Sequence, residues 1–388
     1  MVKPSARSNV APFYVMEVMR AAEQRERAGH EVLHLEVGQP STGAPAGAVA
    51  AVSEIMQVDN LGYTGAAGMP RLRDRIGRWY RDRHQIDVAT ERIVVTTGAS
   101  GSCVLTFLAA FDHGQRVGVL EPGYPCYRND LQALGADVVA IQVGHDTGFR
   151  PTITQLDAAL PLDGLVIASP SNPTGTVLPP AELRAVVNWA TDHQVTLIVD
   201  EIYHGITYDV ECPSALQYGD DLIVFNSFSK YFSMTGWRLG WVVAPPAMAA
   251  AIERLSQSLT IAPPTVSQVA GLAAFDCTDE LDANVDRYRR NRTVMLEGLG
   301  RAGLSRYAPA DGAFYVWADV SRLVGHVGGS SQDLAGVWLD ELGVAATPGI
   351  DFDRQRGHDF IRFSYATATD AITEAMDRIG AWVEQIGP

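Results

Sequence analysis

The chain has 388 residues, of which 47% are hydrophobic and 19% are charged. This length supports a large buried core without stabilising cross-links, and the composition excludes a disordered or collagen-like chain. The formal net charge is −15. Such an acidic protein repels phosphate backbones and anionic lipid headgroups, so we expect no nucleic-acid partner and no membrane partner.

The cysteine and histidine patterns favour a reducing compartment and no catalytic metal. The four cysteines are far apart and form no CxxC pair, which argues against a disulfide framework and a zinc site. The nine histidines show no ligand spacing such as HExxH. The first fourteen residues contain no apolar signal core. We therefore expect a cytoplasmic protein.

The middle of the chain alternates short, strand-like apolar runs with amphipathic helical patterns. This alternation predicts an α/β fold in which helices flank a mostly parallel sheet on both faces. Ligands of such sheets gather at the carboxyl ends of the strands. The predicted strands are Arg92–Thr96, Arg116–Leu120, Asp137–Ile141, Gly164–Ala168, Val195–Val199, Leu222–Asn226 and Leu239–Ala244.

The two ends of the chain have a different pattern and predict a smaller α+β domain built from both. We place the large α/β domain at residues 41–280 and the small domain at 1–40 plus 281–388. For the flanks we predict helices at 13–29, Leu281–Leu299 and Gln332–Leu342, and strands at Val32–Val37, Ala313–Ala318 and Phe360–Ser364.

Lys230 is the first candidate catalytic residue. Only Lys3 and Lys230 are lysines among 30 basic residues, so a lysine in mid-chain suggests a role that arginine cannot fill. Lys230 follows a predicted buried strand and precedes Arg238 by eight positions. Burial and a nearby cation lower a lysine pKa, which makes the amine an imine-forming nucleophile or a base. The alternative is a lysine at a strand end that reaches into solvent.

The segment around this lysine resembles the lysine signature of the class I/II aminotransferases. It reads Ser227-Phe-Ser-Lys230-Tyr-Phe-Ser-Met-Thr-Gly-Trp-Arg238-Leu-Gly240, and further family motifs occur in order from Leu35 to the last predicted helix. Members of this family are pyridoxal 5'-phosphate (PLP) enzymes of fold type I. The resemblance therefore implies that fold and a PLP cofactor bound to Lys230.

Four further residues match family positions around the cofactor ring. Asp200 would hold the ring nitrogen, whereas Tyr203 and Asn172 would donate to the phenolic oxygen. Tyr124 falls where the family stacks an aromatic ring on the cofactor. Taken alone, Asp200 could cap a turn and Tyr124 could be a packed turn residue.

A loop rich in small residues, Thr96–Ser102, joins a predicted strand to a helix. Such a loop exposes backbone N–H groups at a helix N-terminus and suits a phosphate, although many strand–helix turns have this composition. The resemblance implies a phosphate site. Its residues would be Gly98, Ala99, Ser100, Ser227, Ser229 and Arg238.

Besides Asn172, which also belongs to the substrate-binding set, three residues match family positions that bind substrate or join two subunits. Arg362 corresponds to the arginine that grips the substrate carboxylate, for which a planar guanidinium is well suited; a plain salt bridge is the alternative. Gly38 matches a glycine that lets substrate approach the backbone. Tyr63 matches a tyrosine that reaches the partner's phosphate site, which implies a homodimer with shared active sites.

The resemblance implies ping-pong transfer of an amino group from an L-amino acid to a 2-oxo acid. No obvious cation for a second substrate carboxylate is present in the phosphate loop, which favours a neutral aliphatic or aromatic substrate with Tyr14, Val15 and Val37 as pocket candidates. A loop difference, Phe352-Asp353 in place of the usual Phe-Gly, bears on specificity. A PLP-dependent β-lyase of the cysteine-conjugate type is the alternative, because the same residues serve both reactions. A non-catalytic PLP-binding regulator is the alternative of another class.

Overall fold

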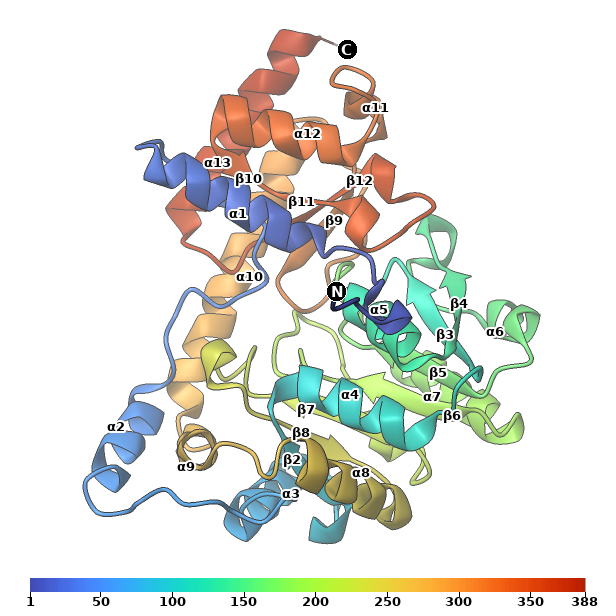
Figure 1. Cartoon of the computed structure of the whole chain (residues 1–388). Coiled ribbons are helices and arrows are strands. Elements are labelled where there is room, and N and C mark those ends of the chain that lie inside the picture. Colours follow the sequence, from blue (N-terminus) through green and yellow to red (C-terminus); the bar gives the residue numbers. More distant parts are fainter. Residues whose placement is uncertain (388) are drawn as a thin grey trace.

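A seven-stranded sheet forms the centre of the computed structural model, which describes residues 1–387 (Figure 1). The spatial order is β2-β8-β7-β6-β5-β3-β4, and only β8 runs antiparallel to its neighbours. The predicted mostly parallel sheet is thus confirmed. Its strands are β2 (Ile93–Thr96), β3 (Arg116–Glu121), β4 (Asp137–Gln142), β5 (Gly164–Ala168), β6 (Thr196–Asp200), β7 (Ile223–Ser227) and β8 (Gly240–Val243).

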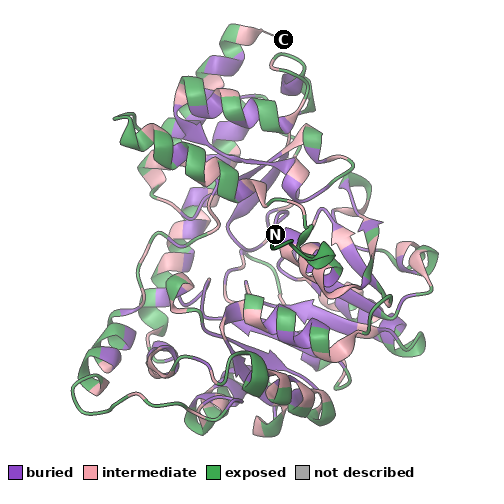
Figure 2. Ribbon diagram, in the orientation of Figure 1, coloured by how far each residue is buried: buried purple, intermediate pink, exposed green. Residues whose placement is uncertain are grey.

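Helices cover both faces of this sheet because its strands are apolar on both sides. In β6, Ile198 packs into one core cluster, whereas Leu197 and Val199 pack into the other. Figure 2 shows the strands as a buried layer between helices whose outer sides are exposed. One face is covered by α4 (Gly98–Ala110), α5 (Pro125–Leu134) and α8 (Pro246–Leu259), and the other by α3 (Pro70–His84) and α7 (Pro180–Asp192), with α6 (Ile153–Ala159) beside α7.

A second, smaller group of elements comes from the two ends of the chain. Its antiparallel sheet has the order β11-β12-β9, and β1 pairs with β10 in parallel. The strands are β1 (Leu33–His34), β9 (Tyr315–Asp319), β10 (Val344–Ala345), β11 (Thr347–Pro348) and β12 (Phe360–Ser364). The helices are α1 (Tyr14–Arg27), α10 (Thr278–Arg301), α11 (Ser321–Val324), α12 (Ser331–Val337) and α13 (Thr369–Ile386). The residue boundaries of the two predicted domains stay a prediction.

Two of the flanking elements differ from the sequence-based expectation. Only Leu33–His34 of the predicted strand at 32–37 is a strand, because the chain turns into the loop that contains Gly38. The helix predicted to reach Leu342 is regular up to Val337 and continues as one π-helical segment, Trp338–Leu342.

The helices α2 (Ala46–Ile55) and α9 (Thr265–Ala274) pack against each other beside the large sheet. Among residues 1–387, no helix is long and apolar enough to cross a bilayer.

Candidate active site

A cavity of about 310 Å³ lies where β5, β6 and β7 end and the smaller sheet begins. It collects eleven of the fourteen residues that the sequence singled out. They are Gly38, Ala99, Ser100, Tyr124, Asn172, Asp200, Tyr203, Ser229, Lys230, Arg238 and Arg362. Position at the carboxyl ends of parallel strands explains this convergence, because the loops after neighbouring strands meet at one edge of the sheet.

Lys230 projects into this cavity from the turn that follows β7. Its Nζ donates a hydrogen bond of 2.5 Å to the carbonyl oxygen of Gly38. Burial, together with the positive charges of Arg362 and Arg238, lowers the pKa of Lys230 to about 8, while Asp200 opposes the shift. A substantial fraction of this amine is therefore neutral near pH 8, as a nucleophile or a base requires.

Asp200 is the last residue of β6, and its carboxylate is buried. Its Oδ2 accepts a hydrogen bond of 2.5 Å from the hydroxyl of Tyr127, and Oδ1 accepts one of 2.9 Å from the backbone N–H of Ile202. Burial raises the pKa of Asp200 to about 6, whereas these two hydrogen bonds and Lys230 act in the opposite direction. A carboxylate held in this way can stabilise a cationic ligand atom in the cavity.

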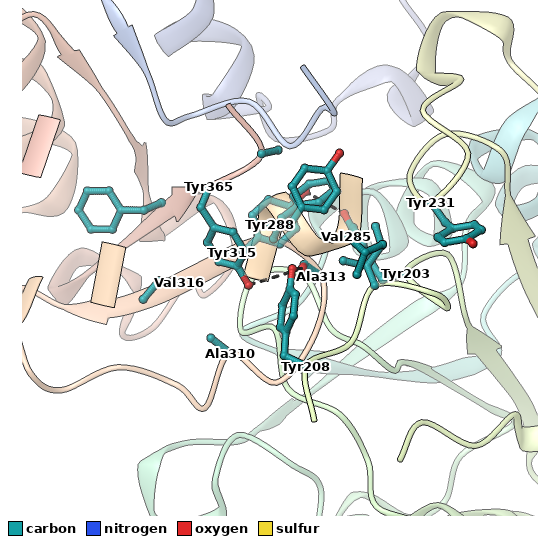
Figure 3. Close-up of a cluster of buried hydrophobic side chains, with 14 of the residues drawn as sticks. Tyr203, Tyr208, Tyr231, Val285, Tyr288, Ala310, Ala313, Tyr315, Val316 and Tyr365 are labelled. Carbon is teal, nitrogen blue, oxygen red and sulfur yellow. Dashed lines mark hydrogen bonds between the residues drawn. The ribbon is translucent and has the colours of Figure 1, made fainter. Parts of the chain in front are cut away.

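Tyr203 is linked to the smaller sheet by a pair of hydroxyls. Its oxygen lies 2.8 Å from the hydroxyl oxygen of Tyr315 in β9, and the two rings meet edge to face within a buried cluster of tyrosines (Figure 3). A methyl group at Gly38 would overlap the Tyr315 hydroxyl. A glycine at position 38 therefore leaves room for the hydroxyl pair.

Arg362, in β12, has its guanidinium fixed by hydrogen bonds. Nη1 donates to Oδ1 of Asn172 at 3.0 Å, and Nη2 donates to the carbonyl oxygen of Glu36 at 2.5 Å and to Oγ1 of Thr347 at 3.2 Å. Asn172, which the resemblance assigned to the cofactor ring, is thus also a partner of Arg362.

Two aromatic rings complete the surroundings of Arg362. Its guanidinium carbon lies 4.5 Å from the ring centre of Tyr315 and 4.7 Å from that of Phe352. A guanidinium held by aromatic faces and hydrogen bonds presents its planar fork to a carboxylate at little entropic cost.

The loop before α4 and the turn before β8 approach each other closely. Gly98, the first residue of α4, has φ +75°, and a Cβ at this position would lie 2.7 Å from Nη2 of Arg238. Ala99 and Ser100 in the first turn of α4 line the cavity together with Ser229 and Arg238. Backbone N–H groups at a helix N-terminus beside an arginine form a suitable site for a phosphate.

Three residues of the predicted set do not line the cavity. Gly98 packs behind it against Arg238. The hydroxyl of Ser227 accepts from the backbone N–H of Ser229 and donates to the carbonyl of Leu239, so it supports the turn that carries the cavity residues. Tyr63 is 84% exposed in the loop between α2 and α3, and its role across a dimer interface stays a prediction.

Comparison with known proteins identifies the family. Residues 30–379 match the family model described as "Aminotransferase class I and II". The chain belongs to this family. A valine–pyruvate aminotransferase from Mycobacterium tuberculosis is 47% identical over 382 residues, which cover 97% of each chain. A (5-formylfuran-3-yl)methyl phosphate transaminase from Methanocaldococcus jannaschii is 33% identical and covers 96% of each chain.

Solved structures show the same relationship. An aminotransferase from M. tuberculosis superimposes with a TM-score of 0.95 at 46% identity, over 99% of this chain and 100% of that one. The aspartate aminotransferase from Thermus thermophilus with maleate has a TM-score of 0.92 at 30% identity, over 98% and 100% of the two chains. The predictions of an aminotransferase and of fold type I are therefore confirmed.

The aminotransferase has an apolar wall on the side of the cavity that α1 covers. Val15 and Val37 line this wall as expected, but Tyr14 does not; Val15 is the buried residue in the first turn of α1, whereas Tyr14 is only half-buried and lies outside the cavity. Residues that the sequence did not indicate complete the wall. Phe13, Met16 and Met19 come from α1 and its N-cap, and Cys126 comes from the facing helix α5.

The sequence-based reading of this aminotransferase also missed Tyr127 and Tyr315. Tyr127, in the first turn of α5, lies three positions after Tyr124, the N-cap residue of that helix, and the two ring centres are 5.4 Å apart, so the spacing could have indicated a second site residue. Tyr315 carries no local signal, since only the pairing of β9 with β12 brings it beside Arg362. In the part of the chain that the structure describes, no three acidic, histidine or cysteine side chains are grouped to hold a metal ion.

Proposed function

We propose that this aminotransferase binds PLP at Lys230 and transfers the amino group of a neutral L-amino acid, valine before others, to pyruvate by a ping-pong mechanism. The observation that carries the proposal is the position of Lys230, with its lowered pKa, in one cavity with Asp200 and Arg362.

The cavity residues fit this cofactor. Lys230 offers an amine, Asp200 a buried carboxylate for a ring nitrogen, and Tyr203 a hydroxyl for the phenolic oxygen. Ala99 and Ser100, at the helix N-terminus, would receive the phosphate with Ser229 and Arg238, and Gly98 leaves Arg238 the space that a Cβ would fill. When bound, the cofactor supplies a carbonyl carbon for the substrate amine and an electron-withdrawing ring.

In this scheme, three residues of the cavity have separate roles in substrate binding, proton transfer and charge stabilisation. Arg362 binds the α-carboxylate of the amino acid and orients its Cα. The amine of Lys230, of which a substantial fraction is neutral near pH 8, would take the proton from Cα of the amino acid, hold it at Nζ and deliver it again. Asp200 would hold the ring nitrogen of the cofactor in its protonated, positively charged form, which keeps the ring electron-withdrawing.

The preference for a neutral substrate follows from the charges in the cavity. Among the described residues, the cations that line it are Lys230, Arg238 and Arg362, and each has a role in this scheme. None is left for a second carboxylate, and the wall formed by α1 is apolar. The printed name of the mycobacterial relative supports valine and pyruvate as the first pair to test.

We further propose a cytoplasmic homodimer in which Tyr63 of each subunit completes the phosphate site of its partner. The exposed position of Tyr63 on a loop leaves it available for such a contact.

The direct test is turnover of valine with pyruvate, followed by chromatography of the product alanine. We expect alanine to form with added PLP and not to form with the Lys230→Ala variant. Alanine formation from aspartate or glutamate at a rate above that from valine would contradict the neutral-substrate proposal.

A further inference from the structure

The first turn of α1 forms a hydrogen bond with a residue near the other end of the chain. The backbone N–H of Val15 donates a hydrogen bond of 3.1 Å to Oδ2 of Asp351, 336 positions away. At the N-cap position of α1, Phe13 has no side-chain oxygen for the free N–H groups of the first turn. Asp351 therefore supplies the cap that the local sequence lacks.

Asp351 lies in the protein interior, where an ionised carboxylate is destabilised by the loss of water. It ends the short helical turn Gly349–Asp351 between β11 and β12, and the residue is 1% exposed. Its Oδ1 is buried without a hydrogen-bond partner. Burial raises the pKa of Asp351, while the backbone N–H groups of Val15 and Tyr14 and the charges of Arg362 and Arg128 act against the shift. Burying a carboxylate costs free energy, and the hydrogen bond from the backbone N–H of Val15 offsets part of that cost for Asp351.

The turn that Asp351 holds is part of the cavity wall. Phe13, Val15 and Met16 line the cavity, and Met19 continues the wall one turn further along α1. Phe13 also meets the ring of Tyr124 edge to face at 6.1 Å. Figure 1 shows α1 lying across the smaller sheet, which contributes Arg362 to the same cavity. A shift of this turn would change the space in the cavity beside Arg362, where the proposed amino-acid substrate would bind.

We propose that Asp351 determines side-chain specificity by positioning the apolar wall of α1 over the substrate. Asp351 does not line the cavity, so it is a positioning residue rather than a catalytic one. The inference rests on the proposed amino-acid substrate, and it identifies the apolar part of that substrate as the group that α1 contacts.

The test compares Asp351→Ala, which removes the hydrogen-bond acceptor, with Asp351→Asn, which keeps an acceptor without the charge. Amino-acid half-reactions are followed for valine, leucine and alanine. In Asp351→Ala we expect kcat/KM for valine and leucine to fall about 5- to 30-fold, the factor that corresponds to the usual cost of a lost cap, mostly through KM. Alanine, whose side chain is a single methyl group, should change less than about twofold, and Asp351→Asn should recover most of the loss.

Thr152→Ala is the matched control, because Thr152 caps α6 away from the cavity by accepting from the backbone N–H of Gln155. It should leave the preference for valine over alanine unchanged. An independent readout is hydrogen exchange of the Val15 amide in the PLP-free protein, which should accelerate in Asp351→Ala and return toward the original rate in Asp351→Asn.

The outcomes separate this inference from the proposed function. If the unaltered protein shows no half-reaction with any amino acid, the proposed function fails. If the unaltered protein reacts, but Asp351→Ala slows valine and alanine equally or leaves Val15 exchange unchanged, Asp351 has only a general structural role and the inference is overturned. If only Asp351→Asn folds, full retention of the valine preference supports the hydrogen bond, and loss of the preference without faster Val15 exchange contradicts it.

Discussion

The hydroxyl of Tyr127 donates a hydrogen bond of 2.5 Å to Oδ2 of Asp200, in the interior of the cavity. This bond stabilises the carboxylate and lowers the pKa of Asp200 against the effect of burial. In the PLP-free Tyr127→Phe variant we therefore expect the pKa of Asp200 to rise above its value of about 6. Carboxyl carbon NMR titration measures this pKa, with Asp200→Asn to assign the signal. An unchanged pKa would show that Tyr127 does not contribute.

The same carboxylate makes stability depend on pH. Because Asp200 has a pKa of about 6 in the folded PLP-free protein and 3.8 as its ordinary value, the folded state binds the proton more tightly than the unfolded state. Its contribution is fully present below pH 4 and is lost as the pH rises through 6. We expect the free energy of unfolding of Asp200→Asn relative to the original protein to improve by about 2–3 kcal/mol over this interval. Urea unfolding at a series of pH values measures it, and a flat difference would contradict the shifted pKa.

The attachment of PLP to Lys230 can be measured with little interference, because the chain has only one other lysine, Lys3. The pKa of Lys230 is lowered to about 8, so the neutral amine accumulates as the pH rises toward and past 8. We expect the initial rate of PLP attachment to the PLP-free protein to rise with pH and to level off above about 8. The Lys3→Arg variant should behave in the same way, whereas Lys230→Ala should lose the attachment whose rate levels off above about 8. An inflection near 10, the range of an ordinary lysine, would contradict this environment.

The guanidinium of Arg362 is held by hydrogen bonds to Asn172, Glu36 and Thr347, and in the proposed function it binds the substrate carboxylate with two parallel hydrogen bonds. Arg362→Lys keeps the charge but loses the planar geometry and the guanidinium's contacts with the rings of Tyr315 and Phe352. We expect KM for the amino acid to rise roughly 10- to 100-fold, the cost of one charge-assisted hydrogen bond. PLP attachment to Lys230 should be little changed, which absorption spectroscopy checks. A normal KM in this variant would place substrate carboxylate binding elsewhere.

The large sheet could be predicted from the sequence because each of its strands can be recognised from its own local residue pattern. Each is a short apolar run between helical patterns, and runs such as Gly164–Ala168 appear with the same bounds in the structure. The strand expected at 32–37 was wrong for most of its length, since only Leu33–His34 pairs with β10. Pairing with a segment about 300 positions away is not encoded in the local pattern.

In the candidate site, too, residues within local motifs could be predicted, whereas residues placed by tertiary contacts could not. Lys230, Asp200 and Arg362 lie in motifs with fixed spacing, so the sequence alone indicated them before their convergence on one cavity was known. Tyr315 and Asp351 were not predicted because their roles depend on tertiary contacts, the first with Tyr203 and the second with the start of α1. Residues that act through long-range packing carry no local signature.

The measurement that tests the central claim most directly is the absorption spectrum of the PLP-loaded protein during stepwise addition of valine and then pyruvate. The account predicts a visible band that bleaches with valine alone and returns when pyruvate is added, because the amino group is stored on the cofactor between two half-reactions. A band that bleaches and returns without any 2-oxo acid, while ammonia accumulates from a β-substituted amino acid, would instead identify a lyase. The absence of any band at saturating PLP would contradict the cofactor assignment itself.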